Sequence, residues 1–268
     1  MKRIRYSARS EEELAAARTG GPLPDIWSTG VAAVWETDPD AVAAVLPPPL
    51  KPDEHALVRL NISQVDLLGH PLGAGSVSVS ARHGDRAGWY ALVMPMSTER
   101  ALVSGREVFG EPKKLGEVTV ERDGDRVLAR MVRHGIAFTE VDARVSEELP
   151  LPPESESLAF YFKVLPAVDG DGTDGDPLLV HCLRRERVRR LERLTGEVIL
   201  RESAYDPVAD LPVRRLRELT VGEKTSDQRG RVAERVSAQA LLPYLHQRYD
   251  DPRQITDAPP GPANGGAA

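Results

Sequence analysis

The sequence LVRLNISQV occupies residues 57–65 and alternates apolar with polar side chains. From Val58 to Ile62 the even positions are apolar, whereas the odd positions Arg59 and Asn61 are polar. A period of two predicts a β-strand with one face in a core and a polar face on the other side. This pattern recurs along the chain and therefore decides the fold class.

Further strand signals lie on both sides of this segment. Asp123-Gly124 separates two strand-like runs and is a strong signal for a tight β-hairpin. The predicted strands are residues 57–65, 76–84, 117–121, 126–132, 160–165 and 197–201. Many strands joined by short turns predict an α+β protein, mainly antiparallel, with a β-barrel or sandwich and flanking helices.

Helix signals are few. Asp38 can cap a helix that starts with Pro39 and ends before Pro47–Pro49. A second helix is predicted from Ser97 to about Phe109, and one or two more between residues 230 and 249. These helices are too sparse for an alternating βα architecture, which agrees with the barrel or sandwich.

The chain has 268 residues, which suits one large domain. Residues 1–25 are predicted to be a loosely attached arm. Residues 26–250 contain no linker or repeat and are predicted to form a single domain. Residues 251–268 have the composition of a disordered tail.

The composition excludes several classes of function. A net charge of −6 argues against a nucleic-acid partner, and no apolar stretch is long enough to span a membrane. The N-terminal residues lack an apolar signal region, so we expect a cytoplasmic protein. The single cysteine, Cys182, excludes an internal disulfide framework. The six histidines are scattered without ligand spacing, so no metal site is expected.

Two of the six lysines, Lys113 and Lys114, are adjacent within GREVFGEPKKLG, residues 105–116. Lysine, unlike arginine, can act as a neutral amine when its surroundings lower its pKa. The arginine-rich run RRERVRRLER, residues 184–193, contains interleaved glutamates and is interpreted as a solvated or subunit-contact face.

The segment 105–116 resembles the active-site lysine region of the acetoacetate decarboxylase superfamily, whose members carry Gly-Arg-Glu followed by Pro-Lys-Lys-Leu. Other blocks resemble the family in the same order. They are ETDPDAVAAVLPPPL, HALVRLNI, FKVLPAVDG and LTGEVILRESAYDPVADLPV. The sequence is therefore identified as a divergent member of this superfamily.

The resemblance implies a mainly antiparallel barrel or cone, a homo-oligomer and a Schiff-base enzyme without a cofactor. The family's nucleophilic lysine falls on Lys113, and Lys114 falls on its cationic neighbour. A lysine with a pKa of about 10.4 is neutral only about once in two thousand molecules at pH 7. Acetoacetate decarboxylase is the standard example of a lysine activated by desolvation or a nearby cation.

Geometry modifies this expectation. Adjacent residues on an extended strand point to opposite faces, so the side chains of Lys113 and Lys114 need not meet. Burial beneath Val108, Phe109 and Leu115 would then lower the pKa of Lys113 more than the neighbouring charge. Phe109 is accordingly a predicted substrate-binding residue.

Three polar partners of the family reaction are absent. The family's arginine matches Ser28 or an adjacent residue, its first glutamate matches Asn61, and its second falls near residues 73–76, where no acid occurs. Asn61 could orient a substrate oxygen or a water. Glu111 is either a replacement acid or a surface carboxylate. Arg59, on the predicted face of Asn61, is a candidate for the missing arginine.

The resulting hypothesis is a lyase that forms a Schiff base between Lys113 and a small oxo acid, with decarboxylation of a 3-oxo acid. An aldolase or dehydratase acting on pyruvate or another 2-oxo acid in secondary metabolism is the alternative, because the three partners are absent. A non-catalytic small-molecule-binding protein of the same fold is a further alternative. The catalytic candidates are Lys113, Lys114 and Glu111, and the substrate-binding candidates are Asn61, Arg59 and Phe109.

Overall fold

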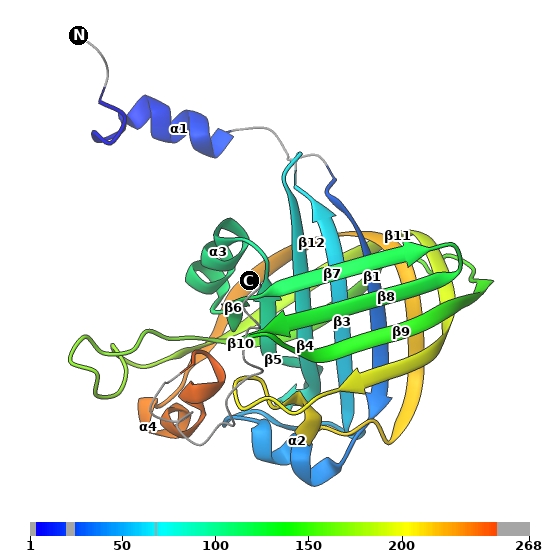
Figure 1. Cartoon of the computed structure of the whole chain (residues 1–268). Helices are drawn as coiled ribbons and strands as arrows, with labels where there is room; N and C mark the ends of the chain where they lie inside the picture. Colours follow the sequence, from blue (N-terminus) through cyan, green and yellow to red (C-terminus); the bar gives the residue numbers. More distant parts are fainter. Residues whose placement is uncertain (1–3, 20–24, 68, 251–268) are drawn as a thin grey trace, which may run out of the picture.

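The computed structural model describes residues 4–19, 25–67 and 69–250, in which twelve strands form one sheet. Seven strands run in the spatial order β10 (Ser155–Lys163), β5 (Arg86–Met96), β4 (Pro71–His83), β3 (Leu57–Asp66), β1 (Trp27–Glu36), β12 (Arg215–Arg235) and β11 (Leu178–Leu200). Because β10 also pairs with β11, these seven strands close into a barrel (Figure 1). Every pair in the ring is antiparallel except β5 with β10. The predicted fold class is confirmed.

Two short strands, β2 (Lys51–Pro52) and β6 (Lys113–Leu115), pair with β4 and β5 respectively. The other three strands, β7 (Glu117–Asp123), β8 (Arg126–Arg133) and β9 (Ile136–Glu148), form an extension that covers one side of the barrel. The long strand β11 leaves the barrel and pairs with β9, which continues to β8 and β7. These three strands pass across β1, β3 and β4 (Figure 1), and the main apolar core lies between the two layers.

Strand β3 shows how the sequence pattern positions both the core and the cavity. Its even residues Val58, Leu60 and Ile62 are fully buried in the main core. Its odd residues Arg59 and Asn61 line a cavity inside the barrel. The alternation is a consequence of the strand pleat, and it separates apolar packing from a polar interior surface.

The described residues include helices that lie beside the barrel and one, α1, that stands apart from it (Figure 1). They are α1 (Glu11–Thr19), α2 (Pro39–Val45), α3 (Glu99–Phe109), α4 (Ala238–Leu241) and the short 3₁₀ helices η1 (Val208–Asp210) and η2 (Leu242–Gln247). The predicted helix at Pro39 and the predicted helix ending at Phe109 are both present. At the start of α3, the Thr98 hydroxyl accepts the Ala101 N–H at 3.4 Å, as expected of an N-cap.

The helical segments predicted between residues 230 and 249 are present as α4 and η2. They begin only at Ala238, because residues 230–235 belong to β12 and pair with residues 178–182 of β11. In the predicted arm, residues 11–19 form α1, and the predicted tail 251–268 lies outside the described residues.

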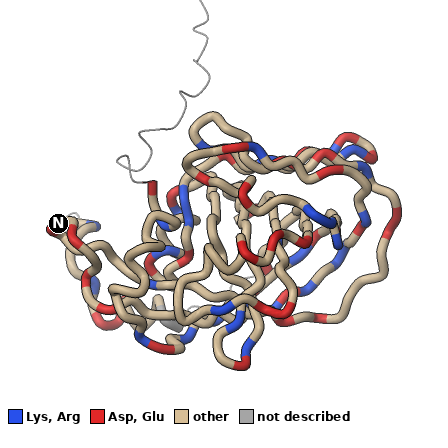
Figure 2. Tube along the Cα trace, turned by 90° about the horizontal axis from the view of Figure 1, so that it is seen from below, with Lys and Arg blue, Asp and Glu red and all other residues tan. Residues whose placement is uncertain are grey.

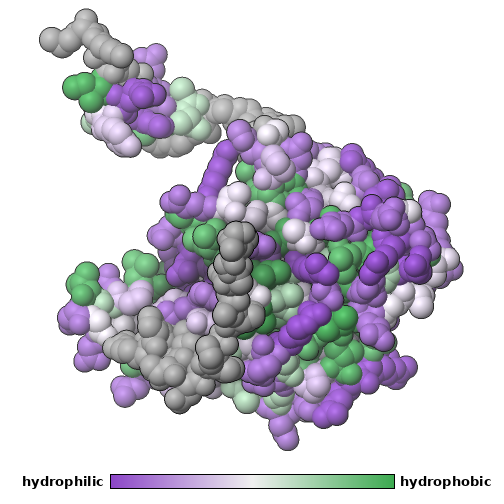
Figure 3. All heavy atoms as spheres, viewed as in Figure 1, coloured by the Kyte–Doolittle hydropathy of each residue, from purple (hydrophilic) through white to green (hydrophobic). Residues whose placement is uncertain are grey.

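Charges of both signs are interspersed along the described trace (Figure 2). The face seen in Figure 3 is mostly hydrophilic, with separate hydrophobic patches. On the outside of β11, Arg185 pairs with Glu156 at 2.8 Å and Arg189 pairs with Glu223 at 2.7 Å. The solvated face predicted for residues 184–193 therefore holds for alternate residues only.

His181 on β11 gives the fold a pH dependence that can be tested. The ring is 4% exposed, and its Nε2 lies 2.9 Å from Nδ1 of His83. Burial, followed by the charge of His83, lowers the pKa of His181 to about 4. In the unfolded chain the imidazole of His181 protonates near pH 6.5. Between about pH 6.5 and about pH 4 the unfolded state therefore binds more protons than the folded state. The free energy of unfolding should therefore fall as the pH drops through this interval.

The measurement is urea unfolding at a series of pH values for the wild type, His181→Gln and the control His246→Gln. The wild type and the exposed control should lose stability in parallel between pH 6.5 and 4, whereas His181→Gln should lose less. Equal pH slopes in all three proteins would show that His181 does not titrate in this way.

Candidate active site

A cavity of about 610 Å³ occupies the barrel interior. Of the residues singled out from the sequence, Arg59, Asn61, Glu111 and Lys113 line it together. They come from β3, from the loop after α3 and from β6, and the barrel closure brings these segments to one space. The volume lies within the range of pockets that bind small molecules.

Lys113 begins β6 and presents its amine to the cavity. Its Nζ lies 2.8 Å from Glu111 Oε2 and donates to the Ala101 carbonyl at 3.0 Å. The side chain of Lys113 is 13% exposed and that of Glu111 only 1%. Glu111 is therefore no surface carboxylate, and it is close enough to exchange a proton with the amine.

The local sequence explains this placement. Gly105 on α3 leaves the space in which the Lys113 amine and the Glu111 carboxylate lie, because a Cβ there would meet Nζ at 2.5 Å. Gly110 ends α3 in the left-handed conformation, with φ of 78°. A Cβ at Gly110 would also collide with the Lys163 backbone at 2.5 Å. Gly105 thus provides the space that the Lys113–Glu111 pair requires, and Gly110 allows the chain to reverse direction after α3.

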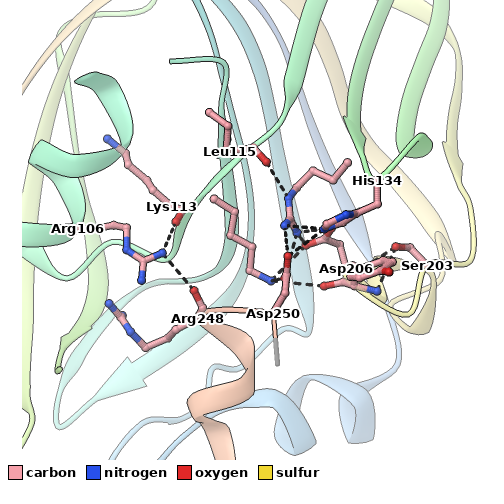
Figure 4. A network of polar contacts seen from close by, with 11 residues as sticks. Arg106, Lys113, Leu115, His134, Ser203, Asp206, Arg248 and Asp250 are labelled. Atoms are coloured by element: carbon pink, nitrogen blue, oxygen red, sulfur yellow. Dashed lines mark hydrogen bonds and ion pairs between the residues drawn. The ribbon is translucent and has the colours of Figure 1, made fainter. Parts of the chain in front are cut away.

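Arg106, which follows Gly105, supports the backbone of β6 and not the cavity. Its Nη1 donates to the Lys113 carbonyl at 2.8 Å and to the Arg248 carbonyl at 3.5 Å (Figure 4). Arg248 in turn donates to the carbonyls of Gly110 and Phe162. The arginine in the GREVFG segment is therefore a structural link between α3, β6 and the C-terminal region.

Lys114 points to the other side of β6, as the strand pleat predicts, and so does not lie beside the Lys113 amine as the family's cationic neighbour would. Its Nζ lies 3.1 Å from Asp250 Oδ1 and 3.4 Å from both Asp206 Oδ1 and the Tyr205 carbonyl. Lys113 points away from this network (Figure 4). The opposite directions follow from the strand pleat.

The network around Lys114 is buried. Arg133 donates to both carboxylate oxygens of Asp206 at 2.7 Å, and to Asp250 and the Leu115 carbonyl. The Asp206 side chain is 0% exposed. Burial opposes ionisation of Asp250, but hydrogen bonds from Arg133 and His134 outweigh it and lower the pKa of that carboxyl. These ion pairs connect β6 and β8 to the segment that follows β11.

Asp206→Ala should destabilise the protein by about 3–5 kcal/mol, because Arg133 and Lys114 would remain buried with one carboxylate fewer. Urea unfolding measures the change. Asp142→Ala is the matched control, since Asp142 pairs with Arg126 on an exposed surface and should cost about 0–1 kcal/mol. Equal losses in the two variants would contradict the structural role of the network.

The apolar cover predicted for Lys113 is not formed by the expected residues. Val108 is 56% exposed and Leu115 is 61% exposed. Phe109 packs beside Gly230 and a second apolar cluster, and it is not among the residues that line the cavity. The amine contacts the Ala101 carbonyl of α3 instead, and Met94 and Tyr161 of the barrel strands line the same cavity.

Four further polar cavity residues are not predicted by the sequence pattern. The run 184–193 reads as a solvated face, and no strand is predicted over the part of β12 that faces the cavity. Arg184 and Glu186 on β11 and Lys224 and Gln228 on β12 line the cavity with Lys113. Their spacing of two and four positions was a visible signal of strand faces. The long-range pairing of β11 with β12 assigns this face to the interior.

Lys224 is a second amine in the cavity. Its Nζ lies 3.3 Å from Asn61 Oδ1 and 3.3 Å from Glu186 Oε1. Burial lowers the pKa of Lys224, and the charge of Glu186 opposes that shift. A cation therefore contacts the asparagine that occupies the position of the family's first glutamate.

The other departures from the family pattern also line the cavity. Ser28, which with its neighbours was matched to the family's arginine, lines the cavity and donates to the Lys224 carbonyl at 3.0 Å. Residues 74–76 line the wall without an acid. Tyr244 and Tyr249 pack against the main core. The acids and bases that line this cavity therefore come mainly from other strands than the family pattern suggests.

Two further findings concern the described residues. They contain no group of three or more His, Cys, Asp or Glu residues that could hold a metal ion. Among their helices, none combines the length and the apolar character that a membrane crossing requires.

Comparisons with known proteins identify the family and the fold. The family model for acetoacetate decarboxylase matches residues 8–236. The acetoacetate decarboxylase of Burkholderia vietnamiensis is 28% identical over 199 residues, which are 72% of this chain and 80% of that protein. That of Burkholderia multivorans is 29% identical over 187 residues, which are 67% of this chain and 74% of that protein.

Solved structures share the fold. Acetoacetate decarboxylase from Legionella pneumophila superposes with a TM-score of 0.69 at 18% identity, covering 85% of this chain and 98% of that one. The enduracididine biosynthesis enzyme MppR has also been solved, complexed with the condensation product of pyruvate and imidazole 4-carboxaldehyde. It superposes with a TM-score of 0.64 at 18% identity, covering 79% of this chain and 90% of that one. This chain belongs to the acetoacetate decarboxylase family.

Proposed function

We propose that the protein is a lyase that forms a Schiff base between Lys113 and a small oxo acid and releases CO₂ from a 3-oxo acid. The observation that carries this proposal is the Lys113 amine in the barrel cavity, 2.8 Å from the buried carboxylate of Glu111. Membership of the acetoacetate decarboxylase family supports the same reaction class.

The first half of the reaction joins the substrate to the enzyme. Glu111 accepts a proton from the Lys113 ammonium, and the neutral amine attacks the ketone carbon. Glu111 then returns the proton to the hydroxyl of the carbinolamine, which leaves as water. The product is a protonated imine between Nζ and the substrate, and Glu111 is again a carboxylate.

The second half breaks the carbon–carbon bond. The bond to the carboxylate breaks, and its electron pair moves toward the positive nitrogen to give an enamine and CO₂. A water donates a proton to the enamine carbon, and the hydroxide left behind adds to the imine carbon. The resulting carbinolamine breaks down to the ketone and the neutral amine of Lys113, which regains its proton from solvent. The protonated imine serves as the electron sink, so this sequence needs no cofactor.

An aldolase or dehydratase reaction on a 2-oxo acid is the second candidate. The cavity volume of about 610 Å³ favours it, because a four-carbon acid would fill only part of such a space and a second reactant could enter. In that reaction the enamine carbon attacks an aldehyde in place of a proton. The relative MppR, whose structure holds a product of pyruvate and an aldehyde, supports this possibility.

Borohydride trapping tests the proposal. The protein is incubated separately with acetoacetate, pyruvate and 2-oxobutyrate, reduced, and mapped by peptide mass spectrometry. An adduct on Lys113 with acetoacetate, together with CO₂ release, is the expected result. Trapping with pyruvate alone would favour the second candidate. If no oxo acid is trapped, the reactive-amine proposal fails and a small-molecule-binding protein becomes the better explanation.

A further inference from the structure

Two arginines face the barrel cavity from different strands. Arg59 belongs to β3 and Arg184 to β11, and both line the space that contains Lys113. The guanidinium of Arg59 stacks on Trp89, with its carbon 4.5 Å from the ring centroid. Burial, followed by the charge of Arg184, lowers the pKa of Arg59 to about 10. The two cations are therefore close enough to repel each other in a desolvated site.

Neither arginine has an ion pair within the part of the chain that the structure describes. The buried Nε of Arg59 has no hydrogen-bond partner there. By contrast, the two cavity lysines are paired, Lys113 with Glu111 at 2.8 Å and Lys224 with Glu186 at 3.3 Å. A buried charge without a partner is costly, so an anionic ligand would stabilise this arrangement.

Among the described residues, the cavity acids form no ion pair with either guanidinium, although the charge of Glu186 favours the ionised form of both arginines. Glu223 pairs with Arg189 at 2.7 Å and with Arg190 at 3.1 Å. Glu218 is exposed and accepts a hydrogen bond from the Thr220 hydroxyl at 3.4 Å. The guanidinium donors thus stay available to a molecule inside the barrel.

A hydrogen-bond chain connects this region to the reactive amine. Arg184 donates to Gln228 Oε1 at 3.0 Å, and Gln228 Nε2 donates to Glu111 Oε1 at 3.2 Å. The other oxygen of Glu111 contacts Lys113. An anion bound at Arg184 would therefore lie in the same polar network as the group that reacts with the ketone.

We propose that Arg59 and Arg184 form a carboxylate-binding subsite that holds an oxo acid while its ketone carbon meets Lys113. The inference rests on the proposed function for the role of Lys113. Guanidinium groups suit carboxylates because their N–H groups match the two oxygens.

The first test measures anion binding without any reaction. Succinate, which has no ketone, is titrated calorimetrically into the wild type, Arg59→Gln, Arg184→Gln and the control Arg185→Gln. Arg185 is the neighbour of Arg184 on the outer face, 49% exposed and paired with Glu156. Succinate should bind about tenfold or more weakly to the two cavity variants and normally to the control. Absent binding to the wild type, or equal affinity in all four proteins, would overturn the subsite.

The second test separates the subsite from the reactive lysine. Borohydride trapping at Lys113 is compared for pyruvate and its methyl ester, which has no carboxylate. The wild type should favour the acid, whereas Arg59→Gln and Arg184→Gln should lose that preference and still trap the ester. An unchanged preference would contradict the subsite. Failure to trap either compound with intact succinate binding would contradict the Schiff base alone.

Discussion

Lys113→Ala is expected to reduce oxo-acid turnover by about a thousandfold or more, because it removes the only group proposed to bond the ketone carbon. The backbone contacts of β6 do not depend on the Lys113 side chain, but the variant leaves the buried Glu111 carboxylate without its cation. Circular dichroism must therefore show that the variant is folded before turnover is compared. Turnover is measured as CO₂ release or as consumption of the oxo acid. Lys113→Arg should be equally inactive, because it keeps the charge but has no nucleophilic amine at neutral pH.

Two lysine variants serve as controls for this experiment. Lys51→Ala changes an exposed lysine on β2 and should leave turnover unchanged. Lys224→Ala removes the other cavity amine and should leave the borohydride adduct on Lys113. Turnover at the wild-type level in Lys113→Ala would refute the assignment of the nucleophile. So would an adduct found mainly on Lys224 in the wild-type protein.

Gly105→Ala should lower turnover by about a hundredfold while the protein stays folded. The new Cβ would lie 2.0 Å from Glu111 Oε2 and 2.5 Å from Lys113 Nζ, so both groups must move. A displacement of about 1 Å at a reacting group can cost about a hundredfold in rate. Alanine favours helices by about 1 kcal/mol over glycine, so α3 itself should not unfold.

The readouts for Gly105→Ala are the trapping rate at Lys113 and the melting temperature. Val103→Ala is the matched control on α3, because Val103 is 43% exposed and does not line the cavity. Slow trapping with a near-normal melting temperature is expected for Gly105→Ala alone. Normal trapping would mean that the amine has more room than its contacts with α3 indicate.

The sequence predicted the local elements well where one segment carries its own signal. The alternation around Asn61, the Asp123-Gly124 hairpin and the helix that ends before Gly110 depend on neighbouring residues, and all three are present. The same logic anticipated that Lys113 and Lys114 would point to opposite faces. Local backbone geometry determines these features whatever the rest of the fold does.

The sequence did not predict which distant strands share the barrel interior. Arg184 and Glu186 lie in a run that reads as a solvated face, yet they line the cavity. Lys224 contacts Asn61 across 163 positions of sequence. Strand pairing over such separations depends on the whole sheet, so the sequence of one strand does not identify the strand with which it pairs.

By itself the sequence determined most of the strand and helix segments, the mainly antiparallel class and the family resemblance, and it left Glu111 open between a replacement acid and a surface carboxylate. Only the tertiary structure decided that Lys114 belongs to the buried network of Arg133 and Asp206, and that Arg59 and Arg184 share one cavity. The physical reason is that backbone periodicity acts over a few residues, whereas barrel closure joins strands that are more than a hundred positions apart.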